Sequence, residues 1–227
     1  MEKLNYRRTF FIGLAFLSIC AFWQMYDNVI PLILQNTFHL NETFTGAIMA
    51  ADNILAVFLL PFFGTLSDKA NTRFGKRTPF IITGTCVAVL FLMLLPFADK
   101  NQNFIMFVAC LAVLLVAMGF YRSPAVALMP DLTPKPLRSK ANAVINLMGA
   151  IGGVYTLLLI RFLVKGGARP DYTAVFAGVA FLMAAAVILL VLTVKEKKIA
   201  AEIEKEEIQE EKLAGEAIAE NTKELPK

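Results

Sequence analysis

The 227-residue sequence is 57% hydrophobic and only 18% charged, with a mean hydropathy of +0.62. Soluble domains are about 45–50% apolar and about 25% charged, so this chain is too apolar to be a soluble domain. Its net charge of +4 does not indicate a nucleic-acid partner, because the basic residues stand in short segments between apolar runs, as in membrane proteins.

Six apolar stretches follow one another along the chain, each close to the ~20 residues that cross ~30 Å of hydrocarbon. We predict helices, because an open strand in lipid would leave backbone groups unsatisfied. The predicted spans are residues 10–34, 45–63, 79–96, 104–128, 141–163 and 173–194. The expected fold class is an all-α membrane protein, with a six-span transmembrane bundle over residues 1–194.

The loops between these spans differ in charge. With a cytoplasmic N-terminus, the outer side receives four basic residues near the spans: Lys100, Arg161, Lys165 and Arg169. The cytoplasmic side then receives Lys3, Arg7, Arg8, Lys69, Arg73, Lys76, Arg77, Lys135, Arg138, Lys140, Lys195, Lys197 and Lys198. Cytoplasmic loops of membrane proteins carry the excess of Lys and Arg, so we expect both termini in the cytoplasm and a multi-pass protein of the plasma membrane.

The composition changes at Lys195, where glutamate and lysine become frequent. Many of these opposite charges stand three or four residues apart, a spacing that supports helix. The apolar residues among them are only loosely periodic. We therefore predict that residues 195–227 form a solvated, partly helical cytoplasmic linker or tail rather than part of the core.

A motif lies between the second and third predicted spans, where Gly-Thr-Leu-Ser-Asp-Lys over residues 64–69 is followed by Arg-Phe-Gly-Lys-Arg over 73–77. It resembles the loop signature of the major facilitator superfamily. Gly64 would let two helix ends approach closely, Asp68 can accept charge-assisted hydrogen bonds, and Gly75 permits a tight turn. The alternative is a basic loop that only sets topology. The resemblance implies a gating loop made of Gly64, Asp68, Lys69, Arg73, Gly75, Lys76 and Arg77.

The length of this loop and residues 123–133 are similar to the glycoside–pentoside–hexuronide branch, which includes melibiose permease and the plant sucrose transporters. The resemblance implies one half of a twelve-span transporter. The expected partner is a second six-helix half, normally in the same chain, so this chain reads as the N-terminal half of a longer protein; a half-transporter that pairs with itself is the alternative.

Some residues depart from that branch. The aspartates that hold sodium in melibiose permease align with Ala56, Leu60 and Arg122. Arginine is always protonated in proteins and cannot sit in a cation site. The branch's sucrose-transporter arginine aligns with Val126. The resemblance therefore favours coupling to protons over sodium, and it does not imply sucrose as the substrate.

Polar side chains inside the predicted spans give the candidate substrate site. On the first span a ring, amides and a carboxylate share one helical face, which suits a sugar because a ring can stack and polar groups can bind hydroxyls. The expected substrate-binding residues are Trp23, Gln24, Asp27, Asn28, Asn53 and Asn146. The expected proton-coupling residues are Asp27, Asp52 and Arg122, because ionisable groups within spans are costly and normally face a partner or a cavity.

Structural interpretations of the same residues stay open. Asp27 or Asp52 could form an ion pair with Arg122, Trp23 could face lipid, and Asn146 could bond across helices. Gly149 and Gly153 are spaced for close helix packing.

The expected function is secondary active transport of a small polar solute, most simply a sugar or glycoside, by proton symport. Drug or metabolite efflux and a non-transporting membrane scaffold are the alternatives. The sequence shows no set of residues for an enzyme. The cysteines lie in apolar runs without other ligand types at helical spacing, so no metal or cofactor is expected. The remaining expected partners are membrane lipids, the solute and protons.

Overall fold

The computed structural model describes residues 4–164, 167 and 170–205. These residues include six long helices and one 3-10 turn: α1 (Tyr6–Asn36), α2 (Glu42–Lys69), α3 (Thr78–Lys100), α4 (Phe104–Asp131), η1 (Lys135–Leu137), α5 (Arg138–Leu163) and α6 (Thr173–Thr193). All six helices are long and apolar enough to cross a membrane. The predicted all-α membrane fold with six spanning helices is confirmed.

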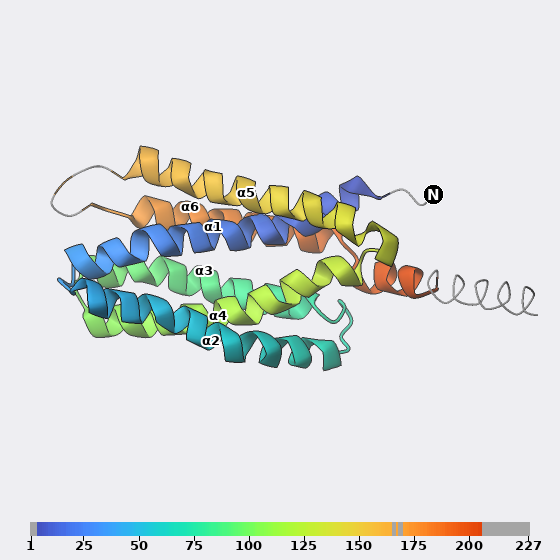
Figure 1. Cartoon of the computed structure of the whole chain (residues 1–227), viewed down its shortest axis with the longest axis horizontal. Helices are drawn as coiled ribbons and strands as arrows, with labels where there is room; N and C mark the ends of the chain where they lie inside the picture. The colour runs from blue at the N-terminus through green and yellow to red at the C-terminus, as the bar shows by residue number, and fades with distance from the viewer. Residues whose placement is uncertain (1–3, 165–166, 168–169, 206–227) are drawn as a thin grey trace, which may run out of the picture.

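The helices lie side by side in one elongated bundle (Figure 1). The start of α1, the α2–α3 loop, the α4–α5 connection and residues 196–205 after α6 all lie at one end, on the right in Figure 1. We call this the motif end, because it carries residues 64–77. The connections α1–α2 and α3–α4, the end of α5 and the start of α6 lie at the opposite end.

Most helices begin before or end after the apolar stretches that predict them. Asparagine side chains cap three of the starts: Asn5 accepts from the Arg8 amide, Asn41 from the Phe44 amide and Asn103 from the Met106 amide. Such a cap satisfies one of the amides that a helix start leaves free. These caps let α1 and α2 extend into polar residues that hydropathy alone does not assign.

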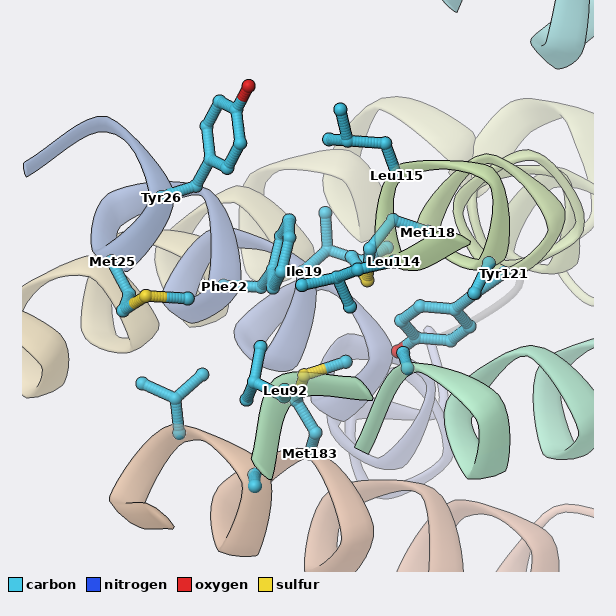
Figure 2. Packing of buried hydrophobic residues seen from close by; sticks show 14 of the residues in the cluster. Ile19, Phe22, Met25, Tyr26, Leu92, Leu114, Leu115, Met118, Tyr121 and Met183 are labelled. Carbon is cyan, nitrogen blue, oxygen red and sulfur yellow. The ribbon is translucent and has the colours of Figure 1, made fainter. Parts of the chain in front are cut away.

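Helix α1 lies at the centre of the core. It packs against α4, α5 and α6, and Figure 2 shows Phe22 of α1 in one cluster with Leu114 and Met118 of α4 and Met183 of α6. Helix α2 is the opposite case, because it buries only Thr45, Phe63 and Ser67. The exposed positions of α1 are therefore exceptions on an otherwise buried helix.

Glycines bring α5 onto α1. A Cβ on Gly149 would lie 2.8 Å from the sulfur of Cys20, and one on Gly152 would overlap the carbonyl of Leu17. A Cβ on Gly153 would meet only Gln24 Oε1, at 3.5 Å. The close packing expected for the glycine stripe is present at Gly149, and Gly152 rather than Gly153 makes the tightest approach.

The tail differs in part from the prediction. Residues 196–205 are helical, but this part is not fully solvated, because Glu196 and Ile203 are buried and Ile199 packs against the main core. Residues 206–227 of the predicted tail, and Lys3, Lys165 and Arg169 of the predicted loop charges, lie outside the described residues.

Candidate functional site

The polar face of α1 reaches the surface of the bundle near the middle of a membrane-spanning helix. Asp27 and Asn28 are exposed, while Trp23 and Gln24 are half-buried. The Asn28 side-chain amide donates to the carbonyl oxygen of Gln24, 2.7 Å away. The four predicted residues on this helix therefore lie on one side of it, with Asp27 and Asn28 more exposed than Trp23 and Gln24.

Trp23 is fixed in place by aromatic neighbours. Its ring meets those of Phe22 and Tyr26 edge-on, with centroids 5.2 and 5.4 Å away. Trp23 Nε1 and the Tyr26 hydroxyl are both buried, and neither has a hydrogen-bond partner within the part of the chain that the structure describes. An unmet buried donor costs about 1–3 kcal/mol, so the pair is suited to a polar group that enters from outside. The sequence prediction missed Tyr26, because a tyrosine in an apolar run gives no sign of an unmet hydroxyl.

Arg122 of α4 lies over the ring of Trp23, with Cζ 5.5 Å from the centroid. This is a cation–π contact, worth more when it is shielded from water. Neither ion pair considered from the sequence, with Asp27 or with Asp52, forms among the described residues. Arg122 is therefore held by an aromatic ring and carries positive charge beside the polar face of α1.

Asp52 shares a small cavity with Trp23 and Arg122. The cavity holds about 20 Å³, room for one water molecule and not for a sugar. Asp52 Oδ1 accepts from the backbone and side-chain nitrogens of Asn53, at 2.6 and 2.9 Å. This cavity therefore joins residues from three helices, α1, α2 and α4.

The other predicted substrate residues do not line this cavity. Asn53 on α2 and Asn146 on α5 are exposed on the bundle surface, as are Asp27 and Asn28. No cross-helix hydrogen bond of Asn146 is found within the described chain. The predicted site thus divides into a closed part around Trp23, Asp52 and Arg122 and an open part on the bundle surface.

At the motif end, Arg77 joins three segments. Its Nε donates to Asp131 Oδ2 of α4 at 2.9 Å, and its terminal nitrogens contact Asp68 and Ser67 of α2. The Arg77 side chain is only 8% exposed, whereas Asp68 and Asp131 are 58% and 39% exposed. The fork of donors in a guanidinium suits such multiple contacts. The expectation that Asp68 accepts from a basic group is confirmed, with Arg77 as the donor.

The two motif glycines also have specific surroundings. A Cβ on Gly64 would lie 3.1 Å from Ser123 Oγ of α4, and that hydroxyl donates to the Leu60 carbonyl at 2.8 Å. Gly75 has φ +127°, a conformation that other residues rarely adopt. The helix approach expected at Gly64 and the turn expected at Gly75 are both present.

Lys69, Arg73 and Lys76 are exposed, and their side chains make no ion pair within the described residues. The loop also uses side chains outside the predicted set, namely Ser67, Asp131 and Glu196. Ser67 stands inside the motif and Asp131 ends the last turn of α4, so their positions in the sequence could have indicated a role in this loop. Glu196 is separated from the loop by more than a hundred residues, so no signal in the sequence linked it to the loop.

Comparison with known proteins is consistent with this architecture. The sequence model of the Major Facilitator Superfamily matches residues 10–224. The sucrose transport protein SUC3 of Arabidopsis thaliana is 24% identical over 151 residues, which are 58% of this chain and 25% of that protein. Its SUC4 counterpart is 29% identical over 113 residues, 43% of this chain and 22% of that protein. The chain thus matches about a quarter of the length of these relatives. No solved structure matches it.

Proposed function

The chain belongs to the major facilitator superfamily, and we propose that it serves in proton symport of a sugar or glycoside across the plasma membrane. One observation carries this proposal: the unmet donors of Trp23 and Tyr26 lie beside the exposed Asp27 and Asn28 on a membrane-spanning helix. A charged side chain costs about 2.5–3.5 kcal/mol at the centre of a helix in lipid. These groups are therefore expected to face an aqueous pathway.

A sugar suits this set of groups. The Trp23 ring offers an apolar face, Nε1 and the Tyr26 hydroxyl offer donors, and Asp27 and Asn28 can bind hydroxyls. The similarity of two sucrose transport proteins supports a sugar over other polar solutes.

Protons are the proposed coupling ion. Asp27 and Asp52 are the two carboxylates within the described spans near this face, and a carboxyl group can take up and release a proton as its contact with water changes. In the alignment that the sequence resemblance implies, Arg122 takes the position of a sodium-binding aspartate of melibiose permease. A guanidinium at that position argues against a sodium site of that kind.

The proposed transporter contains a second six-helix half, normally supplied by the same chain. Helices α2 and α5 expose large apolar side chains, such as Phe58 and Phe162, together with the polar Asn53 and Asn146. Lipid would cover the apolar groups but not the amides. A second half across an aqueous cavity would accommodate both, as in transporters with a central binding site between repeats.

The orientation follows from the basic residues, with the motif end in the cytoplasm. We expect a single cysteine at Asn101 to react with an impermeant reagent added outside intact cells, and one at Asn71 to react only after permeabilisation. Both positions are exposed, and Cys20, Cys86 and Cys110 would be replaced first. The reverse labelling pattern would contradict the orientation.

Substrate binding can be tested at Trp23, which is the chain's only tryptophan. We expect its fluorescence to change in a saturable manner when the transported sugar is titrated into the purified protein. Trp23→Phe keeps an aromatic ring and should remove the signal, which assigns it to this residue. A panel of monosaccharides, disaccharides and aryl glycosides that leaves the emission unchanged in the folded protein would contradict a sugar site here.

A further inference from the structure

A carboxylate from the segment after α6 lies buried against the start of α3. Glu196 is only 4% exposed. Its Oε1 accepts from the backbone amides of Lys76 and Arg77, at 2.7 and 2.8 Å. Its Oε2 accepts from the amide and the hydroxyl of Thr78, at 2.8 and 2.6 Å. Both oxygens of the carboxylate are therefore fully engaged by one short stretch of chain.

This contact replaces the cap that α3 lacks. The N-cap residue of α3, Arg77, makes no side-chain capping bond, and Pro79 follows in the first turn. The first amides of a helix have no partner within the helix, and a negative charge is favourable there. Glu196 supplies the acceptor and the charge across a separation of 118 residues from Thr78.

The turn before α3 is shaped around the same carboxylate. A Cβ on Gly75 would overlap the carboxyl group of Glu196, and Gly75 also has a positive φ of 127°. Two separate reasons therefore require glycine at this position. The loop conformation and the position of Glu196 depend on each other.

Arg77 takes part in two sets of contacts at the motif end, those of the Glu196 carboxylate and those of its own guanidinium. Its backbone amide donates to Glu196, while its guanidinium bonds Asp68 and Asp131. Fixing the backbone of Arg77 fixes the origin of the side chain that joins α2 to α4. Ile199, one turn further along the segment, packs against the main core and anchors it.

We propose that Glu196 is a positioning residue that holds residues 75–78 so that Arg77 reaches Asp68 and Asp131, and that it thereby couples the segment 195–205 to α3. The positioning stands on the contacts alone. Its consequence for transport rests on the proposed function: α3 and the segment move together when the motif loop changes its contacts.

Hydrogen–deuterium exchange of the full chain in lipid nanodiscs tests the positioning directly. In Glu196→Ala, the amides of Lys76, Arg77 and Thr78 should exchange at least about tenfold faster, because each loses a charged acceptor. Glu196→Gln keeps one acceptor oxygen and should give an intermediate rate. The matched control is Glu202→Ala, an exposed glutamate of the same helix, which should leave these amides unchanged.

Two outcomes would overturn the proposal. In one, the three amides exchange in Glu196→Ala as they do in the wild type. In the other, exchange rises equally in peptides from α1 and α4, so that the residue only supports global stability.

In transport assays, Glu196→Ala should lower the maximal rate and leave KM unchanged, with partial rescue by Glu196→Gln. A wild type that transports no sugar would refute the proposed function while the exchange result still decides the positioning.

Discussion

Replacing Asp27 with asparagine is expected to abolish uphill accumulation of the transported sugar while exchange of sugar across the membrane continues. Asparagine has nearly the same shape and can still bind a hydroxyl, but it cannot carry a proton. Because Asp27 is exposed on the bundle surface and makes no ion pair within the described residues, the change should not unfold the protein. Accumulation and exchange would be measured in the same reconstituted vesicles, with the amount of inserted protein as a reference.

Asp52→Asn is the matched comparison. Asp52 lies in the small cavity with Arg122 and Trp23, and its carboxylate is bonded by Asn53. We expect Asp52→Asn to keep uphill accumulation. If Asp52→Asn removes accumulation and Asp27→Asn does not, the proton carrier lies in the cavity. If both variants accumulate sugar as the wild type does, neither carboxylate couples transport to protons.

Arg77→Ala is expected to reduce the transport rate by at least about tenfold and to lower stability by about 1–3 kcal/mol, the cost of removing a partner from polar groups bonded to it. The loss in stability is limited because Asp68 and Asp131 are partly exposed and can bind water. The transport rate should fall because α2, α4 and the start of α3 lose their common link.

The conservative and control variants sharpen this test. Arg77→Lys keeps the charge but not the planar fork of donors, so it should transport poorly as well. Asp68→Asn should impair transport with nearly normal abundance. Arg73→Ala removes an exposed arginine of the same loop and should behave as wild type. Transport by Arg77→Ala at the rate of Arg73→Ala would mean that the loop only sets topology.

The six helices could be predicted because each membrane helix is a run of consecutive apolar residues. Their ends could not be predicted as well. Helix α2 begins at Glu42, before the apolar stretch, because the side chain of Asn41 caps it, and α5 is preceded by the 3-10 turn Lys135–Leu137. These features depend on single side chains and turns, to which an average over apolar residues is insensitive.

The motif residues were recognisable from order and spacing, but their roles were not equal. Four basic residues in the loop looked alike in the sequence, and only Arg77 is buried and bonded to two carboxylates. The acceptor Glu196 comes from a different part of the chain and could not be paired with the loop by spacing. Arg122 was considered as an ion-pair partner of Asp27 or Asp52, whereas in the structure it lies over Trp23. Packing between helices decides such contacts, and a single sequence does not contain them explicitly.

The most direct test of the account is sugar accumulation by the transporter, assembled with its second six-helix half, in vesicles with imposed ion gradients. With an inward proton gradient and no sodium, we expect a labelled sugar or glycoside to accumulate above its outside concentration, and a protonophore to abolish this accumulation. Accumulation driven by a sodium gradient alone and insensitive to pH would contradict proton coupling. No accumulation of any sugar under either gradient would contradict the proposed function itself.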